Sequence, residues 1–183
     1  MTEPRVSPQA AWDSLVAGNA RFIAGGPQHP RQDVERRNEL AGVQKPDAAL
    51  FGCSDSRLAA EIIFDAGLGD LFVARNMGHV VAESIVASME YAVANLGVAI
   101  IVVLAHDSCG AVAASIDLMA QDPDPVPVAV ENTLQPILPA VQHLWMRENR
   151  NTPYVDRALI DPDAVGRIHL GSTVNALLRS SRI

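Results

Sequence analysis

Hydrophobic residues gather in short continuous runs along the middle of the chain. The run Ala99–Ala105 is rich in β-branched residues and has no polar alternation, which is typical of a strand covered on both faces. Ala48–Gly52 and Leu71–Ala74 also have strand length and end in polar residues. Stretches of helical character, Ala59–Ala66 and Val80–Leu96, separate these runs. Strands that alternate with helices predict an α/β fold with a mostly parallel β-sheet flanked by helices.

The N-terminal part of the chain predicts a helical arm. Ser7 is a capping residue, Pro8 suits the first helical position, and Gly25-Gly26 ends the helix. Apolar residues recur on one side of this helix at roughly helical spacing: Trp12, Leu15, Phe22 and Ile23. A polar connection then runs to Lys45-Pro46.

The proline-rich stretch Asp122–Pro127 breaks the strand–helix pattern. Beyond it the chain is predicted to be helical, with interruptions at Pro136 and Pro139 and a restart at Asp161-Pro162. We therefore expect a single domain that spans residues 1–183. Its parts are an N-terminal helical arm (1–46), an α/β core (47–121) and a helical C-terminal part (122–183).

Composition narrows the class of protein. The chain is 49% hydrophobic and 19% charged, which is ordinary for a soluble globular domain. A net charge of −7 and scattered arginines argue against nucleic acid or an anionic membrane as a partner. Met1–Ser7 is polar, unlike a secretory signal, and Leu96–Ala105 is about half as long as a membrane span. We therefore expect a cytoplasmic protein, in which cysteines serve as metal ligands or thiols rather than disulfides.

Chemically reactive residues directly follow two of the predicted strands. Ala48–Gly52 leads into Cys-Ser-Asp-Ser-Arg at 53–57, and Ala99–Ala105 leads into His-Asp-Ser-Cys-Gly at 106–110. In open α/β sheets, ligands bind outside the carboxyl ends of the strands. If the two strands are neighbours, both motifs lie on one rim of the sheet.

These motifs contain a donor set suited to zinc. Cys53, His106 and Cys109 provide three ligands and leave a fourth position open, which is the pattern of catalytic zinc sites. A helix that begins near Cys109 would aim backbone N–H groups at the site and favour thiolate and bound anions. Asp55 is placed to take a proton from water on the metal. Arg57 is placed to hold Asp55 in a bidentate pair and keep it off the ion.

Other interpretations of the same residues stay open. Cys53 alone is most simply a small buried hydrophobe, and Asp55 with Arg57 is also consistent with a structural ion pair. A thiol phosphatase would need more residues between Cys53 and Arg57, and a thioredoxin-type pair would need its cysteines close in sequence. His29, His143 and His169 have no cysteine or histidine at ligand spacing and are expected to be surface or internally satisfied residues.

The two motifs resemble the zinc motifs of the β-class carbonic anhydrases. The similarity runs from about Trp12 through Ala114 and includes three supporting segments: Gln44-Lys45-Pro46, Phe72–Asn76 and Met89–Val93. The resemblance implies zinc (Zn2+) on Cys53, His106 and Cys109, with Asp55 and Arg57 as the catalytic pair. The reaction it implies is the reversible hydration of carbon dioxide to bicarbonate and a proton.

The resemblance also implies a substrate site and an assembly. Gln44 would hydrogen-bond substrate or bicarbonate across a dimer interface, and the Gly110 amide would face the bound anion. Phe72, Met77 and Tyr91 would line an apolar carbon dioxide pocket. The implied assembly is a homodimer or a homotetramer.

The sequence departs from the family pattern in three places. Met77 stands where a smaller aliphatic residue is usual, and His79 stands where asparagine is commoner. The family continues past a helix like Val165–Ser181 into another strand, so a C-terminal edge strand is expected to be missing. This shortening keeps open a zinc-binding module with little or no turnover. A related hydrolase that uses the same rim on carbon disulfide or carbonyl sulfide is a further alternative, which the shape of the pocket would decide.

Overall fold

The computed structural model describes residues 2–148 and 152–181. Its main elements follow one another in this order: α1 (Pro8–Ile23), α2 (Val34–Glu39), β1 (Ala48–Cys53), α3 (Ala60–Ile63), β2 (Leu71–Asn76), α4 (Glu83–Tyr91), β3 (Ile100–Leu104), α5 (Gly110–Leu118), α6 (Val128–Leu134), α7 (Leu138–Arg147) and α8 (Pro162–Ser180). Three short helical turns connect them: η1 (Met77–His79), η2 (Ala92–Leu96) and η3 (Gln135–Ile137). Within the described ranges no helix has the length and apolar character needed to cross a membrane.

Three parallel strands form the sheet, in the order β2–β1–β3. The central strand β1 is buried along its whole length. Its last residue, Cys53, pairs with Asn76 of β2, and Gly52 pairs with Leu104 of β3. The two motif-bearing strands are therefore neighbours, as expected, and their carboxyl ends lie side by side. In the described part of the chain β3 is an edge strand.

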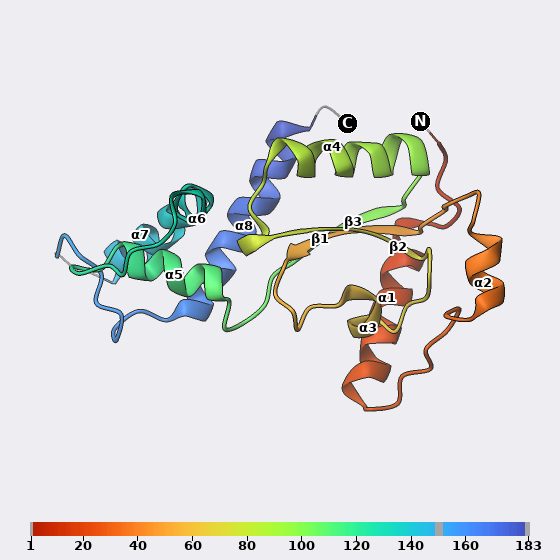
Figure 1. The fold of residues 1–183 in the computed structure, drawn as a ribbon, viewed down its shortest axis with the longest axis horizontal. Helices are drawn as coiled ribbons and strands as arrows, with labels where there is room; N and C mark the ends of the chain where they lie inside the picture. The colour runs from red at the N-terminus through yellow and green to blue at the C-terminus, as the bar shows by residue number, and fades with distance from the viewer. Residues whose placement is uncertain (1, 149–151, 182–183) are drawn as a thin grey trace.

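Helices cover both faces of this sheet, with α4 on one side and α1 and α3 on the other (Figure 1). Ala49 and Phe51 of β1 are fully buried in an apolar cluster with Met89 of α4 and Leu177 of α8. On the opposite side, Ala48 lies in the wall of a cavity that α1 also lines. Because helices cover both faces of the sheet, the strand sequences contain continuous apolar runs rather than alternating polar and apolar residues.

A second apolar core lies beyond the carboxyl ends of the strands, among α5, α6, α7 and α8 (Figure 1). Its fully buried members include Leu134, Ile137, Val141 and Val165. Cys53 and Cys109 belong to the same cluster. The residues of the two motifs therefore lie at the junction between the sheet and the C-terminal helices.

Most predicted boundaries agree with the structure, and the differences have local causes. The Ser7 hydroxyl accepts a hydrogen bond from the backbone N–H of Ala10, so α1 begins at the predicted cap. The stretch predicted as a helix from Ala59 to Ala66 forms only the single turn α3. The structure also contains α2, which was not predicted and which Asp33 caps by accepting from the Arg36 N–H.

Candidate metal centre

Two loops bring the three predicted ligands together. Cys53 is the last residue of β1, His106 follows β3 by two residues, and Cys109 occupies the N-cap position of α5. One ligand atom from each lies within 4.8 Å of the others. We call residues 53–57 the first ligand loop and residues 106–109 the second ligand loop.

The orientation of His106 leaves one nitrogen available for a metal ion. Its Nδ1 lies 2.9 Å from the backbone oxygen of Asp107, so Nδ1–H donates and Nε2 carries the lone pair. Nε2 is buried and has no hydrogen-bond partner among the described residues. An unpartnered buried nitrogen beside two buried free thiols fits a zinc ion with an N, S, S donor set.

Neighbouring groups shift the pKa of the Cys109 thiol in opposite directions. Burial raises the pKa of Cys109, and the neighbouring Cys53 thiol raises it further. The backbone N–H groups of Val112 and Ala111, in the first turn of α5, act to lower it. A cation bound at Cys109 would offset the burial that raises the pKa of this thiol.

Asp55 is fixed by Arg57 beside the three ligands. The guanidinium donates two hydrogen bonds to the carboxylate, from Nε to Oδ1 at 2.9 Å and from Nη2 to Oδ2 at 2.8 Å. The Arg57 backbone N–H donates to the same Oδ1 at 2.9 Å, which closes an Asx turn. These bonds hold the pKa of Asp55 well below its ordinary value. Asp55 Oδ2 lies 3.9 Å from His106 Nε2, so the carboxylate borders the donor set without replacing a ligand.

Arg75 and Asn76 at the end of β2 also shape the first ligand loop, a role that the motif search missed. The Arg75 guanidinium donates to the backbone oxygens of Cys53, at 2.8 Å, and of Asp55. The Ser54 N–H donates to the backbone oxygen of Asn76 at 2.8 Å. An arginine at the carboxyl end of the strand next to β1 was the available sequence signal.

The predicted substrate residues divide into two groups. Gly110 begins α5 beside Cys109, and Met77 packs against the apolar cluster that contains Cys53. Gln44 is exposed and precedes β1, so it lies at the opposite end of the sheet from Cys53. Phe72 pairs with Ala49 at that same end and contacts the exposed Tyr91, with 6.2 Å between ring centroids. Gln44, Phe72 and Tyr91 are therefore remote from the ligands of their own chain.

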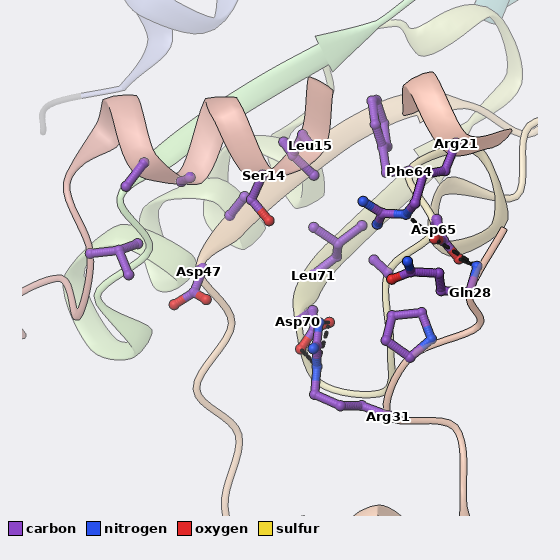
Figure 2. A pocket seen from close by; sticks show the side chains of 16 residues that line it. Ser14, Leu15, Arg21, Gln28, Arg31, Asp47, Phe64, Asp65, Asp70 and Leu71 are labelled. Carbon is purple, nitrogen blue, oxygen red and sulfur yellow. Dashed lines mark hydrogen bonds and ion pairs between the residues drawn. The ribbon is translucent and has the colours of Figure 1, made fainter. Parts of the chain in front are cut away.

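A cavity of about 290 Å³ lies at the amino ends of β1 and β2, away from the metal ligands (Figure 2). Its charged groups satisfy one another. Arg21 of α1 donates to Asp65 at 2.6 Å, and the backbone N–H groups of Gln28 and His29 donate to the same carboxylate. Arg31 pairs with Asp70 in the same way. We interpret this cavity as a structural junction between α1 and the sheet.

The remaining histidines do not belong to the donor set. His29 and His143 are exposed. His169 of α8 is buried and its Nε2 lies 2.8 Å from the backbone oxygen of Gly78. His79 is also buried, and its ring centroid lies 4.6 Å from that of His169.

Taken together, these observations define an α/β protein with a candidate metal centre at the carboxyl ends of parallel strands. The family model described as carbonic anhydrase matches residues 48–180. The chain belongs to the carbonic anhydrase family.

Two curated relatives illustrate the similarity. The chain is 59% identical over 113 residues to carbonic anhydrase 2 of Mycobacterium tuberculosis, and the alignment covers 62% of this chain and 55% of the relative. It is 52% identical over 139 residues to a carbonic anhydrase of Mycolicibacterium smegmatis, and this alignment covers 75% of this chain and 66% of the relative. The matches thus span between about half and two thirds of these relatives.

Solved structures identify the class as β. The β-carbonic anhydrase CafA of Aspergillus fumigatus matches with a TM-score of 0.63 and 27% identity, over 91% of this chain and 74% of that one. One of two tetrameric β-carbonic anhydrases from Sordaria macrospora matches with a TM-score of 0.59 and 27% identity, over 88% of this chain and 75% of that one.

Proposed function

We propose that this protein is a zinc-dependent carbonic anhydrase that catalyses the reversible hydration of carbon dioxide to bicarbonate and a proton. One observation carries the proposal: Cys53, His106 and Cys109 converge, while Arg57 holds Asp55 beside them. A site that only stored metal would need neither Asp55 nor Arg57. Zinc held by these three residues would act as a Lewis acid and lower the pKa of a water molecule.

The chain's own residues supply orientation around that centre. The paired Asp55 carboxylate stays ionised, so its Oδ2 accepts a hydrogen bond and orients the attacking water rather than storing its proton. Arg57 holds this carboxylate beside the donor set and keeps it from becoming a ligand itself. The Gly110 N–H, at the amino end of α5, is a donor for the bicarbonate anion.

The apolar lining of the substrate site is proposed to include Met77 from the same chain and Phe72 and Tyr91 from a partner, whose Gln44 would hydrogen-bond the substrate. Their position at the far end of the sheet from Cys53 supports action in trans, in a homodimer or homotetramer. The Sordaria macrospora relatives are described as tetrameric. We further propose a cytoplasmic location, where two unpaired buried cysteines stay reduced and available to a metal.

Zinc content and stopped-flow carbon dioxide hydration test the proposal directly. The purified chain should carry about one zinc per chain and show turnover between pH 6 and about 9. Asp55→Ala should retain zinc and lose about 10²-fold or more in kcat. Zinc retention without turnover in the wild type would favour a metal-binding module instead. Absence of zinc would exclude both functions.

A further inference from the structure

The second ligand loop depends on an unusual backbone conformation at Ser108. This residue lies between His106 and Cys109 and has φ = 53°, in the left-handed region that residues with a Cβ seldom adopt. Both of its peptide groups are held by side chains. Its N–H donates to Asp163 Oδ1 at 2.8 Å, and its carbonyl accepts from Arg57 Nη2 at 3.1 Å.

Asp163 reaches this loop from a distant element. It lies in the first turn of α8, 55 positions after Ser108, and is half-buried. One turn further along, Arg167 approaches the Asp107 carboxylate at 4.0 Å. That second pair is exposed on both sides and contributes little. The bond from Ser108 to Asp163 is therefore the principal polar link between α8 and the ligand loop.

We propose that Asp163 is a positioning residue of the metal centre, which holds Ser108 in its left-handed conformation and so sets the geometry of His106 and Cys109. The inference rests on the zinc site proposed above. His106, two residues before Ser108, and Cys109, directly after it, both supply ligands, so a change in the Ser108 backbone angles alters their directions relative to each other and to Cys53. Without the Asp163 acceptor, Ser108 relaxes toward the common backbone regions and the three donor atoms no longer converge as well.

Asp163 also has a second effect that the test must separate. A carboxylate in the first turn of a helix is favourable toward the helix dipole, so its removal weakens α8 whatever it does to the loop. Asp163→Asn removes the charge but keeps an oxygen that can accept from the Ser108 N–H. Asp163→Ala removes both. The two variants therefore distinguish loop positioning from helix stabilisation.

The experiment measures zinc release from the zinc-loaded full chain into excess chromophoric chelator. Asp163→Ala should release zinc about tenfold faster than the wild type, whereas Asp163→Asn should stay within about twofold of it. Asp156→Ala is a matched control, because Asp156 Oδ1 also accepts a backbone N–H, from Ala158, in the same C-terminal part. Its release rate should equal that of the wild type.

A second measurement reads the donor geometry itself. Cobalt(II) substituted for zinc should show altered visible absorption bands in Asp163→Ala, with the wild-type spectrum restored in Asp163→Asn. Glycine adopts positive φ without penalty, so Ser108→Gly should make the site less dependent on Asp163. In that background, Asp163→Ala should accelerate zinc release by less than about threefold.

The outcomes separate this inference from the proposed function. Equal release rates for Asp163→Ala and the wild type would overturn the inference and leave the zinc enzyme intact. Equal acceleration in Asp163→Ala and Asp163→Asn would also overturn it, in favour of helix stabilisation. A wild type that retains no zinc would overturn the proposed function, and the positioning role with it.

Discussion

At the scale of single residues, the arrangement around Asp55 depends on the shape of one guanidinium group. Arg57 donates to both carboxylate oxygens and also to the backbone oxygen of Ser108. A planar fork can satisfy all three acceptors, whereas a lysine ammonium is a single point charge. Arg57 thus ties the first ligand loop to the second.

Arg57→Lys should therefore impair catalysis even though lysine keeps the positive charge. We expect kcat/KM for carbon dioxide hydration to fall by about 10- to 100-fold, because Asp55 loses its fixed orientation. Stopped-flow assays on zinc-loaded protein measure this loss. Arg37→Lys, on the exposed surface of α2, serves as the control and should have no effect. Wild-type kinetics in Arg57→Lys would show that the bidentate geometry is dispensable.

A second residue-scale feature is the buried histidine pair. Both ring nitrogens of His79 and the Nδ1 of His169 are buried without partners among the described residues. Burial, followed by the proximity of His169 and His106, lowers the pKa of His79 from 6.5 to about 4. Burial also lowers the pKa of His169. The folded state therefore favours neutral His79 relative to the unfolded chain.

The sign of the resulting pH dependence follows from that lowered pKa. The unfolded chain binds a proton at His79 near pH 6.5, and the folded chain does so only near pH 4, so stability is lost as pH falls through this window. Between pH 7 and 5 the loss attributable to His79 should be about 2 kcal/mol. Urea unfolding of metal-free wild type and His79→Asn checks this prediction. Parallel pH profiles for the two proteins would contradict it.

The three residues of the donor set were predictable from residue types, but the contacts that support the two ligand loops were not. Cysteine, histidine and a carboxylate after two strands indicate a metal centre because few other roles need that combination. Arg75 and Asp163 act through backbone oxygens and a backbone N–H. Such contacts leave no pattern in a single sequence, because many side chains can make them and only the folded chain shows which do.

At the scale of elements, burial decided which predictions succeeded. The strands were predicted within two residues because continuous apolar runs of four to seven residues have few alternatives when helices cover both faces. The short helix α2 has no buried residue, so it produced no apolar periodicity. The Asp33 cap was its only local signal, and a lone cap predicts poorly.

The contact between α1 and α3 provides an element-scale prediction. A Cβ at Gly18 would lie 1.8 Å from the backbone oxygen of Phe64. The two elements therefore pack closely at this point because Gly18 has no side chain. Gly18→Ala should lower the free energy of unfolding by about 2 kcal/mol through this overlap. Gly171→Ala, within α8 and with open space around it, should raise it by up to about 1 kcal/mol. Thermal and urea unfolding measure both, and a neutral Gly18→Ala would contradict the close contact.

At the scale of the whole molecule, the length of β1 separates two parts of the proposed substrate site. A six-residue strand spans about 17 Å, and Gln44 lies beyond its amino end while Cys53 lies at its carboxyl end. One chain therefore does not bring Gln44 to its own zinc ligands. The family resemblance predicted that Gln44 acts across a dimer interface, whereas its short distance from Cys53 along the chain would by itself suggest the opposite.

Complementation between two inactive chains tests action in trans. The Gln44→Ala chain keeps all three candidate metal ligands, and the Cys53→Ala chain keeps Gln44. A mixed dimer, with one chain of each kind, therefore regains one complete site. Co-refolding equal amounts should restore about a quarter of wild-type activity, because half of the dimers are mixed and each has one competent site. A Gln44→Ala, Cys53→Ala double variant in place of Cys53→Ala is the control and should restore none. No recovery in the test mixture would contradict a shared site.

The central position of β1 has a consequence for how the newly made chain matures. β1 pairs on one side with β2, which follows it closely along the chain, and on the other with β3, which is synthesised later. The three candidate ligands can therefore come together only after His106 has been synthesised. The bond from Asp163 to the second ligand loop can form only after α8 has been synthesised. Such distant pairings make assembly slow. Retention of the metal should then be among the last events of maturation, so that a chain that holds its ion has already completed its sheet and docked its final helix.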